Sequence, residues 1–330
     1  MKKFLKILGL LASLLIVIII SGAIYLTIAF PKVSPAQDLK IEYTAERIAH
    51  GKYLANHVVV CMDCHSTRDY TYFSAPLVEG TLGKGGETFN HDMGFPGTFY
   101  SLNITPFGIA DYTDGELYRV ITTGVTNEGR AIFPVMPYPY YGQMDPEDVY
   151  SIISYIRTLP PIDSEIPESK ADFPVSLILK TIPHDPNPQK RPNPTDQVAY
   201  GAYLVNQAAC KECHTPVDSQ GGLLPGKDFS GGRTFGIPGG ALIASSNITS
   251  DESTGIGNWT EATFVARFKE YQDPRYLREK VAIGDFNSIM PWIMYSGMKE
   301  EDLKAIYAYL QTLEPISNQV TRFTPMASLE

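Results

Sequence analysis

The chain has 330 residues, which is long enough for two domains of ordinary size, each with its own hydrophobic core. Its 36 acidic residues outnumber its 27 basic residues, and the formal net charge is −9. This balance argues against a nucleic-acid-binding protein, because such a protein needs a basic surface to attract phosphate.

The amino terminus predicts a membrane anchor at residues 1–31. Three lysines among the first six residues precede an uncharged apolar run at 7–30, which is long enough to span a bilayer. Basic residues before the span place the amino terminus in the cytoplasm, so we expect a single-pass inner-membrane protein with the remainder of the chain in the periplasm. A cleaved signal peptide is the alternative, because small residues occupy positions 21–23, but the apolar run continues past them.

Beyond the anchor, the chain is an internal duplication, which indicates two homologous domains. Four stretches of the first copy recur in order in the second: 48–56 and 198–206, 103–105 and 247–249, 135–138 and 289–292, and 155–162 and 309–316. We therefore expect domains at 41–165 and 195–320. The segment between them, 166–194, is rich in proline and should act as a semi-rigid linker. We expect its apolar piece at 175–182 to pack on a domain surface, with a membrane contact as the alternative.

Each copy contains the pattern Cys-x-x-Cys-His, at residues 61–65 and 210–214. This is the attachment signature of c-type haem, in which two thiols add to the porphyrin vinyl groups and the adjacent histidine ligates the iron. We therefore predict two covalently bound haem c groups. The residues that hold them are Cys61, Cys64 and His65 in the first copy and Cys210, Cys213 and His214 in the second.

A Cys-x-x-Cys pair also occurs in zinc knuckles, thioredoxin-like redox pairs and structural disulfides. Zinc would need four protein ligands from closely paired motifs, and a thioredoxin motif would need a βαβ context. The two haem motifs use all four cysteines of the chain. The repeated Asn-x-Thr triplets at 103–105 and 247–249 are expected to supply loop hydrogen bonds near the haem groups.

Both copies predict helices joined by long loops, and hence an all-α fold. The stretch before each haem motif has apolar residues at helical spacing and a Gly-x-Tyr whose glycine would let another helix approach. A capping box at 113–116 opens a middle helix, and its counterpart opens at Thr260. The last helix of the first copy has Asp145 as N-cap and Pro146 in the first position, and its counterpart covers 303–313. Strand signals are few.

A second axial ligand is needed to complete the coordination of each iron. Met136 and Met290 are the candidates, because both lie between a haem motif and the last helix, and a proline follows each. Methionines that only fill the core are the ordinary alternative. The other possible ligands are Met144, Met294, Met298, His50, His57, His91 and His184. None of these histidines recurs in the other copy, so we expect them at the surface or the edge of the core.

Several stretches resemble the cytochrome c subunits of bacterial membrane-bound alcohol and sugar dehydrogenases. They are residues 201–204, residues 247–260, Met290-Pro291 with the closing Tyr-Leu-x-Thr-Leu-x-Pro and, more faintly, 173–180. The resemblance covers nearly the whole chain after the anchor. It implies a dihaem class I cytochrome c, with thioether bonds at the four cysteines, histidine proximal ligands, and Met136 and Met290 as distal ligands. Those subunits usually carry three haems, whereas this chain has motifs for two and an amino-terminal anchor.

We expect the protein to be a membrane-anchored electron carrier with no catalytic residue of its own. Its redox partners would be a dehydrogenase as donor and a cytochrome or oxidase as acceptor in a respiratory chain. One alternative is a dedicated electron-transfer subunit of a periplasmic dehydrogenase complex. A haem enzyme, such as a dihaem peroxidase or a thiosulfate dehydrogenase-like cytochrome, is a further alternative. It would need an open coordination position, whereas both copies offer a methionine in the same place.

Overall fold

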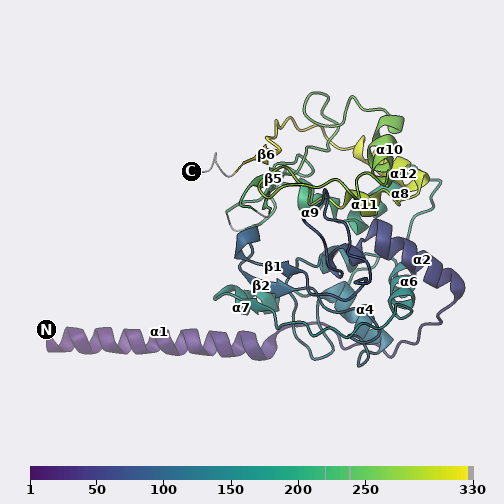
Figure 1. Cartoon of the computed structure of the whole chain (residues 1–330). Coiled ribbons are helices and arrows are strands. Elements are labelled where there is room, and N and C mark those ends of the chain that lie inside the picture. Colours follow the sequence, from purple (N-terminus) through teal and green to yellow (C-terminus); the bar gives the residue numbers. More distant parts are fainter. Residues whose placement is uncertain (220, 238, 326–330) are drawn as a thin grey trace.

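The computed structural model describes residues 1–219, 221–237 and 239–325, and it consists of one long helix and a globular body (Figure 1). Helix α1, Lys2–Ala29, projects away from the body, and none of its residues is buried. Its 28 residues correspond to about 42 Å at the usual rise per residue. The helix is long and apolar enough to cross a membrane, a test that both a membrane anchor and an N-terminal signal sequence pass.

Helices dominate the regular structure, and their order in the first copy repeats in the second. The first copy forms α2 (Ala45–Tyr53), the π-helical turn η1 (Leu54–Val58), α3 (Cys61–Cys64), η2 (His91–Met93), α4 (Asp114–Thr123), α5 (Tyr138–Tyr141) and α6 (Pro146–Ile156). The second copy forms α8 (Gln197–Gln207), α9 (Cys210–His214), α10 (Glu261–Lys269), η4 (Glu270–Gln272), α11 (Trp292–Tyr295) and α12 (Glu300–Leu310). Between the copies lie α7 (Val175–Ile178) and η3 (Leu179–Thr181). The predicted helical character is confirmed.

The helices begin where the capping signals predict. Thr113 and Glu116 form a complete capping box on α4, and Thr260 accepts the amide three residues further on in α10. Helix α6 has Asp145 as its N-cap and Pro146 in its first position. These caps satisfy amide groups that the first turn of a helix leaves unpaired, so the helix ends are fixed by local sequence.

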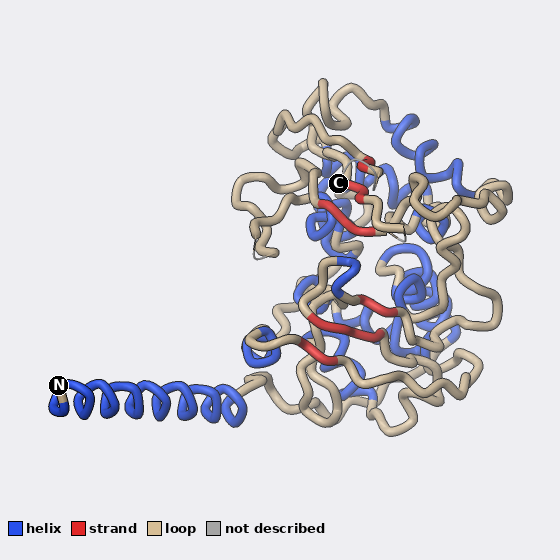
Figure 2. The backbone as a smooth tube through the Cα atoms, turned by 60° about the vertical axis from the view of Figure 1, so that its left-hand side comes forward, coloured by secondary structure: helices blue, strands red, loops and turns tan. Residues whose placement is uncertain are grey.

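Two small antiparallel sheets accompany the helices (Figure 2). The first contains β1 (Thr88–Phe89), β2 (Gly97–Tyr100) and β3 (Lys170–Ala171), and the second contains β4 (Thr234–Gly236), β5 (Leu242–Ala244) and β6 (Phe323–Thr324). The sequence did not predict them, because such short strands in glycine-containing loops display no alternation. Strand β3 lies within the proline-rich segment 166–194 and pairs Ala171 with Gly97, so the start of this segment is tied to the first copy.

In each copy the helix before the haem motif crosses the last helix at a glycine. A Cβ atom on Gly51 would lie 1.8 Å from the carbonyl oxygen of Ser151 in α6, and one on Gly201 would lie 1.9 Å from that of Ala305 in α12. No side chain larger than hydrogen fits such a gap, so the helices pack backbone against backbone. The prediction that the glycine of Gly-x-Tyr admits a second helix is confirmed.

The tyrosine of each Gly-x-Tyr reaches across to the other copy. Tyr53 donates a hydrogen bond to the carboxylate of Asp302 at the start of α12, and Tyr203 donates to Asp148 of α6 at 2.6 Å. Each tyrosine oxygen also accepts the amide of the N-cap residue of the helix it contacts, at 3.0 and 2.9 Å. Contacts that are exchanged reciprocally in this way are those of an isologous interface. The two copies therefore face each other through equivalent surfaces.

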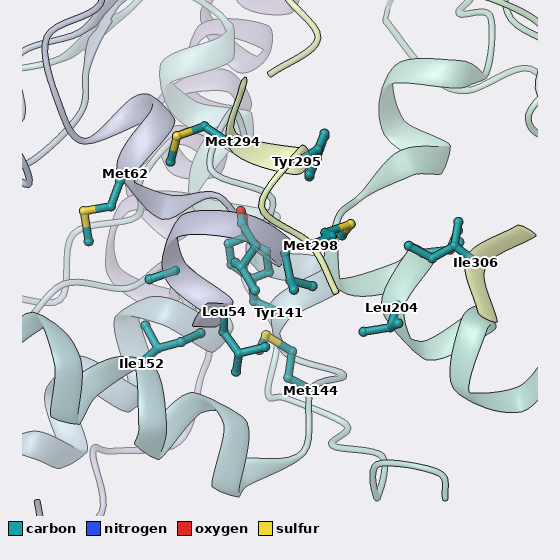
Figure 3. Packing of buried hydrophobic residues seen from close by; sticks show 14 of the residues in the cluster. Leu54, Met62, Tyr141, Met144, Ile152, Leu204, Met294, Tyr295, Met298 and Ile306 are labelled. Atoms are coloured by element: carbon teal, nitrogen blue, oxygen red, sulfur yellow. The ribbon is translucent and has the colours of Figure 1, made fainter. Parts of the chain in front are cut away.

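The hydrophobic core runs through both copies without a break. One cluster of buried side chains includes Leu54 and Ile152 of the first copy and Leu204 and Ile306 of the second. Figure 3 shows these side chains on either side of Tyr141, which lies 7 % exposed in the middle of the cluster. Because a shared core is close-packed, the two copies are held in one arrangement.

Candidate functional site

Both haem motifs start directly after a residue in the left-handed region. Val60 has φ of 50° and precedes α3, and Ala209 has φ of 49° and precedes α9. A residue with a side chain takes up this conformation at a cost of about 1–3 kcal/mol, and such residues concentrate at functional sites. The strained turn ends η1 in the first copy and α8 in the second, and the haem motif begins with the next residue. The sequence does not predict the positive φ at these two positions, because neither residue is glycine or asparagine.

A cavity of about 1060 Å³ lies against the first motif, and its lining includes Cys61, Cys64, His65 and Met136. A second cavity of about 320 Å³ is lined by Cys210, His214 and Met290. Each cavity therefore brings together thiol, imidazole and thioether groups of its own copy. This donor set fits a haem c, because covalent attachment uses thiols and axial coordination uses the imidazole and the thioether. The first cavity has both cysteines of its motif, whereas the second has Cys210, and Cys213 faces the first cavity.

The imidazole of each motif is held by a backbone carbonyl. The Nδ1 atom of His65 lies 2.7 Å from the carbonyl oxygen of Leu102, and that of His214 lies 2.7 Å from the oxygen of Ser246. When Nδ1–H donates to a carbonyl, Nε2 remains free as a metal ligand. Burial lowers the pKa of both histidines, which favours the neutral form that binds iron.

A glycine in each copy brings the histidine close to this carbonyl. Gly85 donates its amide to the carbonyl of His65 at 2.9 Å, and Gly231 donates to that of His214 at 2.7 Å. The two glycines have φ of +73° and +72°, and a Cβ atom on either would overlap the strand of backbone that carries the accepting carbonyl. Only glycine tolerates both constraints, so the loop geometry is the same in both copies.

The Asn-x-Thr triplets fix the backbone that carries these carbonyls. Asn103 donates to the carbonyl of Ile162 at 2.8 Å, and Asn247 donates to that of Ile316 at 2.7 Å. The oxygen of each asparagine side chain accepts the amide and hydroxyl of the threonine two residues on. The prediction that the triplets supply loop hydrogen bonds beside the sites is confirmed.

A carboxylate inside each motif is paired with an arginine. Asp63 lies 2.9 Å from Arg68, which also binds Glu87 at 3.0 Å. In the second motif Glu212 takes the same position and lies 2.5 Å from Arg233. Burial raises the pKa of Asp63, and the charge of Arg68 opposes this effect. The arginines therefore compensate the negative charge inside both motifs.

The alternative ligands lie elsewhere. Of the predicted histidines, His50 and His91 lie 2.7 Å from Asp148 and Asp172, and His57 and His184 contact backbone carbonyls. None of the four lines either cavity. The remaining methionines, Met144, Met294 and Met298, are buried in the core (Figure 3), although Met298 also reaches the second cavity.

The two cavities are adjacent. Cys213 of the second motif lines the first cavity, and Tyr295 lines both. Tyr295 and its counterpart Tyr141 donate to the carbonyls two residues before the first cysteine of their own motifs, at 3.3 and 3.4 Å. Burial raises the pKa of both phenols well above its usual value, so they stay neutral. Sequence reasoning missed these tyrosines, although both stand five residues after the repeated Met-Pro methionine.

No protein-family model matches the chain. It is 28 % identical over 296 residues to the cytochrome c subunit of alcohol dehydrogenase (quinone) from Gluconacetobacter polyoxogenes, which covers 84 % of this chain and 58 % of that protein. It is 28 % identical over 285 residues to the fructose dehydrogenase cytochrome subunit of Gluconobacter japonicus, with 81 % and 52 % covered. A dihaem cytochrome c-type protein of Cereibacter sphaeroides is 31 % identical over 170 residues, with 49 % and 55 % covered.

The chain thus spans little more than half the length of these relatives. A gluconate 2-dehydrogenase cytochrome c subunit of Pantoea cypripedii matches over the same 84 % of the chain, at 28 % identity. These matches agree with the motifs, the carbonyl-bound imidazoles and the cavities in both copies. The chain is a homologue of the cytochrome c subunits of bacterial alcohol, fructose and gluconate dehydrogenases, as its sequence motifs predict.

Proposed function

We propose that the protein is a membrane-anchored dihaem c-type cytochrome that transfers electrons in the periplasm through two His/Met haems. The observation that carries this proposal is the repeated lining of the two cavities, each with cysteine, histidine and methionine from its own copy. Residues 41–165 and 195–320 would each form a class I cytochrome c domain, joined by the linker 166–194. Helix α1 would remain in the inner membrane as a single span.

In the first domain Cys61 and Cys64 would attach the haem, with His65 and Met136 as axial ligands. In the second domain Cys210 and Cys213 would attach it, with His214 and Met290 as ligands. When bound, a haem c supplies a ferric–ferrous couple whose potential a methionine ligand raises. The chain's own residues fix the imidazole through a carbonyl and surround each site with apolar side chains. Limited access of water also tunes the potential.

The two sites support a pair of carriers rather than one carrier and one catalytic centre. A haem enzyme would need an open coordination position, and both cavities have a methionine at the equivalent place, before α5 in the first copy and before α11 in the second. The adjacency of the cavities at Cys213 and Tyr295 supports transfer between the two groups.

A second candidate function is a dedicated electron-transfer subunit of a periplasmic dehydrogenase complex. The names of the relatives favour it, since several are cytochrome subunits of alcohol, fructose and gluconate dehydrogenases. The partners would then be a dehydrogenase as donor and a cytochrome or oxidase as acceptor. Purification of the full-length chain from native membranes in mild detergent tests this candidate. A dehydrogenase subunit present in a fixed ratio supports the complex, and its absence supports a free carrier.

The haem proposal is tested by comparing the purified full-length protein with Met136→Ala and Met290→Ala. We expect two haems per chain by the pyridine haemochrome assay. We also expect a methionine-to-ferric-iron charge-transfer band that each variant reduces by about half. A band that neither substitution reduces, or a high-spin haem in the unmodified protein, would contradict the ligand assignment. The mass of the mature chain shows whether the first 31 residues are retained.

A further inference from the structure

We propose that the loop at residues 70–75 of the first copy positions Met290 of the second copy. This inference rests on the proposed role of Met290 as an axial ligand. It makes the position of Met290 depend on a direct hydrogen bond from the first copy, whereas within the described residues the backbone of Met136 receives no such bond from the second copy. The residues that carry it are Ser74 of the first copy and Asn287 of the second.

The hydroxyl of Ser74 bonds to the backbone on both sides of Pro291. Its Oγ donates to the carbonyl of Met290 at 2.8 Å and accepts the amide of Trp292 at 3.2 Å. Ser74 is only 4 % exposed, so water does not replace these bonds easily. One side chain from the first copy therefore fixes the three residues that carry the methionine into α11.

Asn287 joins the same two loops from the other side. Its Oδ1 accepts the amide of Ser74 at 2.9 Å, and its Nδ2 donates to the carbonyls of Tyr70 and Tyr72, both at 3.2 Å. Asn287 is 5 % exposed. Because both ends of the amide are used, the asparagine holds the 70–75 loop in one position against the segment that leads to Met290.

Backbone pairing and an aromatic contact extend this connection. The amide of Phe73 donates to the carbonyl of Glu279 at 2.8 Å, and the amide of Val281 donates to that of Thr71 at 2.9 Å. The ring of Phe73 stacks on Tyr271 at 5.9 Å between centroids. Tyr271 in turn stacks on the indole next to Pro291, at 4.8 Å. The first copy thus contacts the methionine loop through hydrogen bonds and through the aromatic cluster behind it.

The 70–75 loop is strained where it touches the methionine loop. Ser74 has φ of +57° and Ala75 has φ of +44°, which residues with side chains rarely adopt. Such conformations persist only where the surroundings impose them, and they cluster at functional sites. Here the imposed conformation points the amide of Ser74 at Asn287 and its hydroxyl at the carbonyl of Met290.

The first copy holds Met136 differently. The carbonyls of Met136 and Met290 each accept the amide two residues on, from Tyr138 at 2.7 Å and from Trp292 at 2.8 Å, but within the described residues that of Met136 accepts nothing from the other copy. The loop equivalent to 70–75 is also shorter in the second copy, because an isolated bridge joins Val217 to Leu223 where the first copy joins Arg68 to Leu77. The direct bond to a methionine backbone from the other copy is therefore found at Met290, whereas the second copy reaches the Met136 segment four residues later, where Asn206 donates to the carbonyl of Tyr140.

The test isolates one methionine band at a time in the full-length protein. In the Met136→Ala background the remaining charge-transfer band reports Met290, and in the Met290→Ala background it reports Met136. Ferric protein is titrated with imidazole, which competes with methionine for the iron. In the first background, Ser74→Ala should lower the imidazole concentration for half-loss of the band about tenfold, since two hydrogen bonds to the loop are lost. In the second background it should change nothing.

Two further variants separate the hydroxyl from general effects. Ser74→Gly removes the hydroxyl but tolerates positive φ, so it should reproduce the tenfold shift. Ser154→Ala removes a buried hydroxyl that donates within α6 and lines neither cavity, and it should shift neither titration. Equal midpoints with and without Ser74→Ala in the first background would overturn the inference. If Met290→Ala alone leaves the band intact, the proposed ligation itself is wrong, and this is visible before Ser74 is changed.

Discussion

In both copies of the repeat the imidazole donates to a carbonyl at 2.7 Å, and a glycine with φ near +72° closes the loop that holds it. The methionine loops differ, because both carbonyls accept the amide two residues on but that of Met290 also accepts a hydrogen bond from Ser74 of the other copy. Contacts made within one copy survive duplication because each copy contains both partners. Contacts across the interface can diverge, since each copy meets a different neighbour.

The carboxylates at the interface diverge in the same way. Asp148 is 1 % exposed and is bonded by His50, Arg191, Tyr203 and Gln207. Its counterpart Asp302 accepts a hydrogen bond from Tyr53, and a tyrosine, Tyr200, stands where the first copy has His50. The cation on Asp148 is Arg191, which comes from the linker. The linker therefore makes a nearly symmetric interface asymmetric.

The helix crossings are the strictest common feature, and breaking them should have the largest effect. Gly51→Ala and Gly201→Ala each place a methyl group under 2 Å from a carbonyl oxygen. We expect the free energy of unfolding to fall by about 3 kcal/mol or more in both variants. Denaturant unfolding of the full-length protein, followed by circular dichroism, measures it. Gly9→Ala, where the added methyl group meets no atom within 4 Å, is the control. Markedly unequal losses would show that the two crossings are not equivalent.

Acid should reveal the asymmetry of the carboxylates. Burial raises the pKa of Asp148, but hydrogen bonds from His50 and Tyr203 and the charge of Arg191 outweigh it, and the net shift is downward. The unfolded value is about 3.9. Because the pKa of Asp148 is lower in the folded than in the unfolded protein, its ionisation increases the free energy of unfolding at pH values above the unfolded pKa. This contribution is lost as the pH falls from about 4 through the folded pKa.

We therefore expect Asp148→Asn to cost about 2 kcal/mol at neutral pH, because hydrogen bonds to a charged group are lost. It should also reduce the loss of stability between about pH 4 and pH 2. Unfolding midpoints measured across this range, for the variant and the unchanged protein, provide the check. If acid lowers the free energy of unfolding of Asp148→Asn as much as that of the unchanged protein, the acid sensitivity comes from other carboxylates.

Much of the candidate site could be predicted because its signals are local. The haem motifs, the helix caps at Thr113, Asp145 and Thr260, and the crossing glycines each depend on a few neighbouring residues, and the duplication displays most of them twice. The methionines could be selected because the Met-Pro pair recurs. The cavities beside these methionines are formed by residues that are far apart in the sequence, so sequence patterns do not predict them.

The remaining features depend on contacts that are distant in sequence. Ser74 meets Met290 across 216 positions, and it lies in a loop that is longer than its counterpart, so the repeat gave no hint of it. Strand β3 pairs the linker residue Ala171 with Gly97. Because this strand is only two residues long, its sequence shows no alternation that would predict a strand. The reciprocal hydrogen bonds of Tyr53 and Tyr203 to the other copy could not be predicted, because the repeated Gly-x-Tyr does not indicate which residue the tyrosine contacts. Features of the interface between copies therefore required the structure.

The smallest expected difference concerns these two tyrosines. Tyr203→Phe should cost about 1 kcal/mol and Tyr53→Phe slightly more, because Asp148 keeps an arginine and a histidine after the loss of Tyr203. Unfolding free energies of both variants, and of each tyrosine variant combined with the aspartate-to-asparagine variant of its partner, give the coupling of each pair. A larger coupling for Tyr203 with Asp148 than for Tyr53 with Asp302 would mean that the charges around Asp148 depend on Tyr203 rather than compensate for its loss. Equal couplings would mean that the linker arginine does not distinguish the two halves of the interface.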